Sequence, residues 1–146
     1  MKENATISLK TKQYALDGQE DVIELVTKGT FAQHEGSFYV VYEESEMTGF
    51  VDTTTTIKIT DNKITLSRKG KFQSRMEFIK GEKRLCSYPT PYGLLPVAVS
   101  PTLMKSNLSK DEGGNVILEY ILDLNNKAYA KNKLEMSVKL NGGQTK

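Results

Sequence analysis

The sequence predicts an all-β fold, a single antiparallel meander that closes into a barrel of about 8–10 strands. Three observations predict it. Apolar and polar residues alternate in short runs, turn-forming residues separate the runs, and no segment carries the sustained i, i+3, i+4, i+7 apolar stripe of an amphipathic helix. The chain has 146 residues, which is the length of one domain. We therefore expect residues 1–146 to form a single β-barrel domain.

Ten runs have the composition and alternation of strands. In chain order they are Ala5–Tyr14, Val22–Ala32, Ser37–Glu44, Thr53–Thr60, Ile64–Lys69, Ser74–Ile79, Arg84–Tyr88, Leu94–Val99, Val116–Leu124 and Lys133–Leu140. The breaks carry turn residues, at Asp17-Gly18, His34-Glu35-Gly36, Asp61-Asn62, Lys69-Gly70-Lys71, Lys80-Gly81-Glu82, Gly113-Gly114-Asn115 and Asn125-Asn126. Tight turns between consecutive strands favour antiparallel neighbours.

Closure of the sheet follows from the number of strands, because open edges invite pairing with other chains. Pro96 and Pro101 fit a strand at the barrel seam, since proline cannot donate to a central ladder. Gly29 is expected at a bulge or a sharp bend. The runs Phe38–Tyr42 and Val116–Leu122 are apolar on both faces. A partner subunit in a homodimer, another segment of the chain, or a curled sheet would each cover their outer side.

Composition excludes several classes of protein. Cys86 is the only cysteine, which rules out intrachain disulfides and cysteine-rich zinc sites and fits a reducing compartment. The sequence has no glycine-rich phosphate loop, so we expect no cofactor and no metal. Residues 1–9 lack the regions of a signal peptide, and no run approaches the ~20 apolar residues of a membrane span. We expect a cytoplasmic protein with no membrane partner, in which the single histidine, His34, is an exposed turn residue.

Charge is unevenly distributed although the net charge is only +2. Residues 17–52 contain nine acidic residues and one lysine, whereas residues 58–84 contain nine basic and three acidic residues, including all three arginines. One interpretation is a basic patch near Lys69, Lys71, Arg75 and Lys83 that attracts nucleic acid or phosphate. The other, which we favour, is an acidic set of strands facing a basic set. The small net charge argues against nucleic acid as a partner.

Arg68 breaks the alternation of its strand. It is in phase with Ile64 and Leu66, which places its guanidinium on the core side. A buried cation requires a carboxylate, for which Glu44 and Glu43 are the candidates, and the hydroxyls of Tyr88 or Tyr120 would complete its hydrogen bonds. The alternative is that Arg68 lies at a strand end and reaches solvent.

The segment Tyr88-Pro89-Thr90-Pro91-Tyr92-Gly93 is stiff and aromatic. Each proline restricts the residue before it to extended geometry, so Tyr88 and Thr90 are expected to be extended, and Gly93 can take a positive φ. We expect the two tyrosines to be held at a barrel mouth. The competing interpretation makes them plugs that close the end of the core.

The chain resembles the YwiB-like bacterial proteins. The resemblance covers nearly the whole chain, and the Tyr-x-Thr-Pro-Tyr-Gly and Arg-x-Gly elements are its most specific parts. It is carried by Tyr42-Glu43-Glu44, Gly49, Thr54–Ile57, Arg68 with Gly70, Met76 with Phe78 and Gly81, the segment from Tyr88 to Gly93, and Tyr120. The resemblance implies a calycin-like, lipocalin-type closed barrel of unknown function, with no catalytic residues to transfer.

Three function hypotheses follow. The first is a non-enzymatic binder of a small molecule in or at the mouth of the barrel. Its candidate ligand-binding residues are Glu43, Glu44, Arg68, Tyr88, Thr90, Tyr92 and Tyr120. The second is an interaction or scaffold module that uses an outer apolar or basic surface. The third is an enzyme in which Glu43 or Glu44 acts as acid or base and Arg68 holds substrate charge. Adjacent strand residues point to opposite faces, so the two glutamates cannot form a carboxylate dyad.

Overall fold

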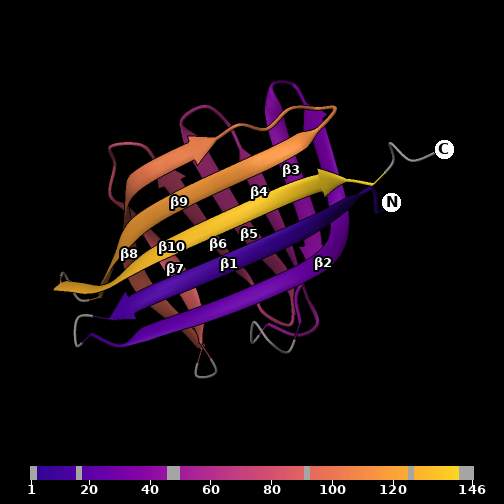
Figure 1. Ribbon diagram of the computed structural model, residues 1–146. Helices are drawn as coiled ribbons and strands as arrows, with labels where there is room; N and C mark the ends of the chain where they lie inside the picture. Colours follow the sequence, from indigo (N-terminus) through magenta and orange to yellow (C-terminus); the bar gives the residue numbers. More distant parts are fainter. Residues whose placement is uncertain (1–2, 16–17, 46–49, 91–92, 125–126, 142–146) are drawn as a thin grey trace.

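All ten expected strands are present in the computed structural model (Figure 1). The structure describes residues 3–15, 18–45, 50–90, 93–124 and 127–141, without the side chains of residues 89 and 90, and it contains no helix in these ranges. The strands are β1 (Ala5–Ala15), β2 (Glu20–His34), β3 (Ser37–Glu43), β4 (Thr53–Ile59), β5 (Lys63–Gly70), β6 (Ser74–Ile79), β7 (Arg84–Thr90), β8 (Gly93–Ser106), β9 (Gly113–Leu124) and β10 (Lys127–Leu140). The all-β prediction is confirmed.

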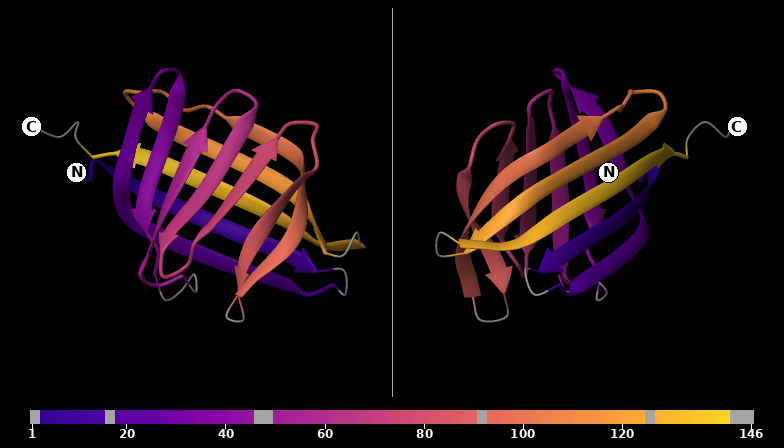
Figure 2. Two further views of the ribbon diagram at one scale, coloured as in Figure 1. Left: turned by 180° about the vertical axis from the view of Figure 1, so that it is seen from behind. Right: turned by 60° about the vertical axis from the view of Figure 1, so that its left-hand side comes forward.

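The ten strands form one sheet with the order β6-β5-β4-β3-β2-β1-β10-β9-β8-β7, and every neighbouring pair is antiparallel. The two edge strands, β6 and β7, contact each other without a backbone ladder and diverge from their shared turn (Figure 2). An ion pair crosses this seam, with Arg84 Nη2 2.8 Å from Glu77 Oε1. The fold is therefore a nearly closed antiparallel barrel.

Strand β2 turns the corner of the barrel at Gly29, where a bend was expected. Residues 20–29 of β2 pair with β1 and residues 29–34 pair with β3, so Gly29 belongs to both ladders. A Cβ at this position would collide with Ile7 Cδ1 and the Val41 carbonyl oxygen, each 2.4 Å away. Only glycine allows the two neighbouring strands to approach this closely. The ladders show no register shift at Gly29, so the expected bulge is absent and the bend alone turns the strand.

The two prolines of β8 lie where the strand has one paired neighbour. Residues 93–99 of β8 pair with β7 and residues 98–106 pair with β9. Pro96 lies in the part paired only with β7, and Pro101 in the part paired only with β9 at a register shift. The seam itself lies between β6 and β7. Strand β8 also contacts β6 where the ladder with β7 has ended, so Pro101 lies in the part of β8 that borders the seam, whereas Pro96 is separated from the seam by β7.

Two strands extend at least six residues beyond their predicted ends, further than any of the others. Strand β8 continues to Ser106 rather than ending at Val99, and β10 begins at Lys127 rather than Lys133. Register shifts between Pro101 and Leu103, and between Ala128 and Ala130, change the phase of the side chains within these strands. In β8 this phase change interrupts the alternation and explains the early end predicted from sequence. In β10 the alternation is unbroken from Ala130, but the inward position 132 is a polar asparagine, so the apolar pattern begins only at Leu134.

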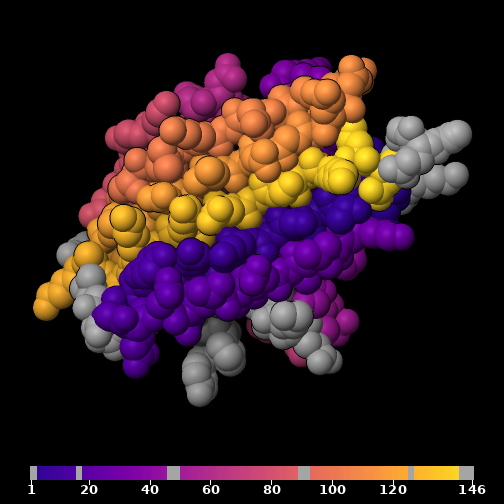
Figure 3. Space-filling view, viewed as in Figure 1, coloured from indigo at the N-terminus to yellow at the C-terminus, as the bar shows by residue number. Residues whose placement is uncertain are grey.

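The apolar outer positions of β9 are covered by long side chains of neighbouring strands. Ile117 lies between Lys105 and Glu135 in the ladders. Lysine and glutamate stems can cover apolar surface while their charged groups stay in water. Figure 3 shows the strands of this face packed side by side. Side chains of both neighbouring strands therefore lie beside Ile117 on the outer face.

Replacing Gly29 with alanine should destabilise the barrel. The added Cβ would force apart β1 and β3, and overpacking of this kind costs about 1–3 kcal/mol. That loss exceeds the ~0.4–1 kcal/mol that Gly→Ala gains through the unfolded chain. Urea unfolding measures the change, with Val26→Ala as the control because Val26 is 71% exposed on the same strand. Equal midpoints for Gly29→Ala and wild type would contradict the close approach.

Candidate functional site

The interior of the barrel is filled at one end and hollow at the other. Side chains such as Phe78, Ile59, Val99 and Val116 are fully buried in the filled part. A cavity of about 260 Å³ lies toward the end that carries the β1–β2, β3–β4, β5–β6, β7–β8 and β9–β10 connections. Its apolar wall is formed by Leu9, Ile23, Leu25, Phe50, Ile57, Leu66, Met76, Phe78, Leu118 and Leu134, and its polar side chains include Thr11, Gln13, Asp21, Tyr42, Glu44, Arg68, Tyr88, Tyr120 and Asn132.

Arg68 points into this cavity and pairs with Glu44. Arg68 Nε lies 3.8 Å from Glu44 Oε2, and the two side chains are only 12% and 2% exposed. The Thr55 hydroxyl donates a hydrogen bond to the same carboxylate oxygen. Tyr42 also hydrogen-bonds with Glu44, and burial together with the Glu44 charge raises the pKa of Tyr42 well above its usual value. The carboxylate is thus held by two hydroxyls, with the guanidinium beyond hydrogen-bond distance.

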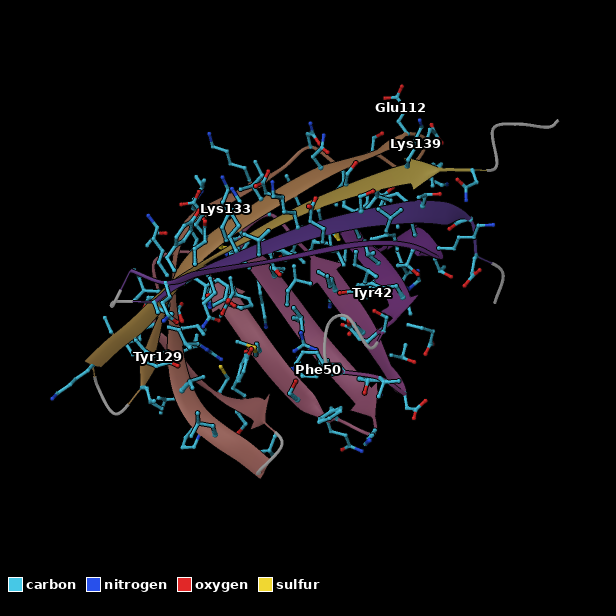
Figure 4. The ribbon with its side chains drawn as sticks, turned by 60° about the horizontal axis from the view of Figure 1, so that its bottom comes forward. Tyr42, Phe50, Glu112, Tyr129, Lys133 and Lys139 are labelled. Atoms are coloured by element: carbon cyan, nitrogen blue, oxygen red, sulfur yellow. The ribbon has the colours of Figure 1, made fainter. Side chains whose placement is uncertain are left out.

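The guanidinium of Arg68 keeps unused donors. Among the described residues, no acceptor forms a hydrogen bond with its buried Nε or Nη1 atom. The Phe50 ring covers the cation, with the guanidinium carbon 4.2 Å from the ring centroid, and Phe72 packs edge-on against Phe50. Figure 4 shows Phe50 and Tyr42 inside the curve of the sheet and Lys133 outside it. Stacking satisfies the face of the guanidinium but not its in-plane N–H groups.

A second polar group faces the cavity from β9 and β10. Tyr120 and Asn132 are directly opposed in the ladder, and their side chains hydrogen-bond with each other. Burial raises the pKa of Tyr120 to about 12, and nearby Tyr88 adds to this, while Asn132 and Arg68 act in the opposite direction. Asn132 is buried, and its Oδ1 atom has no hydrogen-bond partner in the described part of the chain. The cavity therefore presents an unused acceptor as well as unused donors.

Four of the predicted site residues lie together in the cavity, and Glu43 lies on the outer face. Glu44, Arg68, Tyr88 and Tyr120 all line the cavity. Glu43 is exposed on the opposite face, where it accepts a 2.7 Å hydrogen bond from the Thr54 hydroxyl. Glu44 is therefore the partner of Arg68, as one of the two alternatives predicted. The alternation that places Val40 and Tyr42 inside also places Glu44 inside and Glu43 outside.

The predicted hexapeptide is the end of a hairpin rather than a free loop. Tyr88 and Thr90 belong to β7, which confirms their extended geometry, and Gly93 opens β8 with a φ of 118°. Tyr92 and Pro91 lie outside the described residues, and so does the side chain of Thr90. Tyr88 and Tyr120 were expected to complete the hydrogen bonds of the Arg68 pair, but no described hydroxyl accepts from Arg68 Nε or Nη1, and the described contacts of the Glu44 carboxylate come from Thr55 and Tyr42.

Charged residues elsewhere pair locally. Glu77 contacts Lys63, Arg75 and Arg84 on the outer surface, and Lys83 Nζ lies 2.6 Å from Asp123 Oδ2. Strand β4 separates the acidic strand β3 from the basic strand β5. The interpretation of facing acidic and basic strands was therefore wrong for most of these charges. Among the described ion pairs, Arg68–Glu44 is the one that joins the two segments.

The remaining candidates for chemistry do not gather into a site. His34 ends β2 beside the turn and its side chain is 72% exposed, as expected. Burial raises the pKa of the half-buried Cys86 thiol. In the ranges that the structure describes, no three His, Cys, Asp or Glu side chains lie close enough together to hold a metal ion. No helix that could cross a membrane occurs in the same ranges.

Sequence reasoning missed Asn132 and Phe50. Asn132 is in phase with Leu134 and Met136, so extending the alternation of the last strand by two residues would have found it on the core side. Phe50 precedes β4 outside any strand, and no periodic signal marks it. Thr55 alternates in phase with Ile57 on the core side of β4, but nothing in the sequence indicates that its hydroxyl would donate to a glutamate.

Comparison with known proteins decides the family. The model of a domain of unknown function, DUF1934, matches residues 7–136. The chain belongs to the DUF1934 family. YwiB of Bacillus subtilis (strain 168), an uncharacterized beta-barrel protein, is 26% identical over 114 residues, which cover 77% of this chain and 79% of YwiB. The crystal structure of YwiB from Bacillus subtilis superposes with a TM-score of 0.82 at 19% identity, covering 95% of this chain and 92% of that one. The predicted antiparallel barrel and the resemblance to the YwiB-like proteins are confirmed.

Removing Glu44 should destabilise the protein more than removing Arg68. Glu44→Gln leaves a buried cation without its counter-charge, which costs about 3 kcal/mol, toward the low end of the range because Arg68 is not fully buried. Arg68→Met leaves a carboxylate that still accepts from Thr55 and Tyr42, so its loss should be smaller. Denaturant unfolding measures both, with Glu43→Gln as the adjacent outer-face control.

The double variant completes this test. Glu44→Gln combined with Arg68→Met removes the stranded cation and should be no less stable than Glu44→Gln alone. Negligible losses for both single variants would show that Arg68 is solvated.

Tyr120 should titrate late, with a consequence for stability at high pH. Its pKa of about 12 in the folded protein exceeds the value near 10 of an unfolded chain. Between these values the unfolded state loses the proton first, so stability is complete below pH ~10 and falls as pH rises toward 12. Ultraviolet titration of the seven tyrosines should show a late component that Tyr120→Phe reduces. Titration of all tyrosines near pH 10 in the folded protein would contradict this burial.

Proposed function

We propose that this protein is a non-enzymatic binder of a small molecule, held in the cavity of the barrel. One observation carries the proposal: the buried donors of Arg68 face a cavity of about 260 Å³ and have no partner among the described residues. A buried donor without a partner costs about 1–3 kcal/mol, and more when the group is charged. Native proteins keep such a group where a ligand or ordered water completes it.

The surroundings of Arg68 fit a ligand site. The cavity has the mostly apolar wall and few polar groups that are typical of small-molecule pockets, and its volume is near the lower end of their range. It corresponds to about nine water molecules at ~30 Å³ each. A lipocalin-like use of the barrel interior is consistent with this size, for a ligand smaller than most drugs.

An enzymatic role has less support. Glu43 is on the outer face, so an acid or base would have to be Glu44, which already accepts hydrogen bonds from Thr55 and Tyr42. Nucleic-acid binding is also disfavoured, because Arg75, Lys83 and Arg84 of the basic segment are paired with carboxylates.

A second candidate function is protein interaction through the β7–β8 hairpin. Leu85 and Leu94 are 87% and 60% exposed there, which is unusual for leucine outside an interface. Sedimentation across a range of concentrations tests for a homodimer, which Leu85→Ser should weaken.

A thermal-shift screen with a small-molecule library tests the binding proposal. A ligand at ten times its Kd should stabilise the folded protein by about 1.4 kcal/mol, or roughly 3–6 °C in a domain of this size. The shift should persist in Arg75→Met and shrink in Arg68→Met, since both variants lose one arginine but only Arg68 faces the cavity.

Two results would contradict the proposal. One is a library in which no compound raises the melting temperature of the wild type. The other is a set of shifts that Arg68→Met leaves unchanged, which would place binding outside the cavity.

A further inference from the structure

We infer that the cavity selects an uncharged ligand that carries both a carbonyl-type acceptor and an N–H donor, such as a carboxamide, lactam or urea attached to an apolar group. This inference rests on the proposed function and specifies its ligand class. Two features of the cavity determine it: the balance of buried charge, and the types of polar atom left without partners.

The buried charge is already balanced. Arg68 supplies one positive charge and Glu44 one negative charge, 3.8 Å apart. Lys12 and Lys133 also border the cavity, but they oppose each other in the β1–β10 ladder, out of phase with the inward Thr11 and Asn132. The Lys133 ammonium group lies on the outer surface near Glu119 and Glu135 (Figure 4). Asp21 adds a carboxylate to the cavity lining. A carboxylate ligand beside Arg68 would therefore bury a second negative charge close to Glu44, with one cation for two anions.

The unpartnered atoms require both acceptor and donor from the ligand. Arg68 Nε and Nη1 can only donate, so they need an acceptor. Asn132 Oδ1 can only accept, so it needs a donor. Asn132 is 8% exposed, and its hydrogen bond with Tyr120 fixes the other end of the amide. Ketones and ethers satisfy Arg68 alone, whereas an amide group carries both functions.

The rest of the wall is apolar and aromatic. Phe50, Phe78 and Tyr120 line the cavity, and the Phe78 and Tyr120 ring centroids are 4.6 Å apart. Aromatic walls favour a flat apolar group on the ligand. Benzamide combines such a group with an amide and is small enough to serve as a probe.

Four probes of similar shape separate the contributions. Benzamide offers acceptor and donor, acetophenone offers the acceptor alone, benzoate offers two acceptors with a negative charge, and toluene offers neither. Each is titrated into the full-length protein at pH 7 and followed by protein NMR. Benzamide should bind at least ten times more tightly than benzoate and several times more tightly than acetophenone, with toluene weaker still.

Two variants, each with a matched control, test whether Asn132 and Arg68 contribute to the affinity for these probes. Asn132→Ala should remove the advantage of benzamide over acetophenone, whereas Ser137→Ala, on the exposed face of the same strand, should retain it. Arg68→Met should weaken benzamide and acetophenone together, and Arg75→Met should change neither. These comparisons are ratios within one variant, so a moderate loss of stability does not affect them.

Each contrary outcome has a defined meaning. Benzoate binding as tightly as benzamide would overturn the preference for an uncharged ligand, and equal affinities for benzamide and acetophenone would overturn the role of Asn132. Toluene as the tightest probe would overturn the ligand class but leave binding in the cavity intact. If none of the four binds, this inference fails; the proposed function fails with it only when the library screen also finds no ligand dependent on Arg68.

Discussion

The interaction on which the site depends is the buried pair of Arg68 and Glu44. Placing two charges inside a small barrel carries a desolvation penalty that a contact at 3.8 Å does not fully offset. Glu44 is well held by Thr55 and Tyr42, whereas Arg68 contacts the charge of Glu44 and the ring of Phe50, and its Nε and Nη1 atoms have no hydrogen-bond partner among the described residues. A half-satisfied polar network is less stable than a fully apolar core, and natural proteins tolerate such departures mainly at functional sites. The Glu44 carboxylate accepts hydrogen bonds, whereas two buried N–H groups of Arg68 have no described acceptor. This difference is the reason for assigning a ligand to Arg68.

Arg68 lies beside a cavity because side chains fill only one end of the barrel. The bend of β2 at Gly29 carries the sheet around the corner, and the ladder then continues through β3 and β4 to β5. This path places Arg68 of β5 and Asn132 of β10 on the same enclosed space although they are 64 residues apart in sequence. The apolar core beyond them holds the strands in register, so the polar end can remain incompletely packed without loss of the fold.

Sequence reasoning predicted the strands well because the signals are local. Alternation and turn residues identified all ten strands, and phase indicated an inward Arg68 with Glu44 as one of its two candidate partners, which the ion pair confirms. The errors arose where the phase changes, where a polar residue interrupts an apolar run, or where the contact is long-range. The register shift in β8 concealed the second half of that strand, and the polar Asn132 interrupted the apolar run of β10 although it keeps the phase of Leu134. The contacts of the Thr55 hydroxyl with Glu44 and of the Phe50 ring with Arg68 depend on which strands become neighbours, which no local pattern specifies.

The central claim, that buried donors of Arg68 are free for a ligand, is most directly tested at the Nε–H group itself. The protein has three arginines, so a proton–nitrogen correlation spectrum of their Nε–H groups is simple to assign with Arg68→Met, Arg75→Met and a substitution of Arg84. The account predicts that the Arg68 signal exchanges slowly with water and moves on addition of benzamide, while the signals of the two outer arginines do neither. An Arg68 signal that exchanges as fast as that of Arg75 and stays unchanged with every compound would contradict the account.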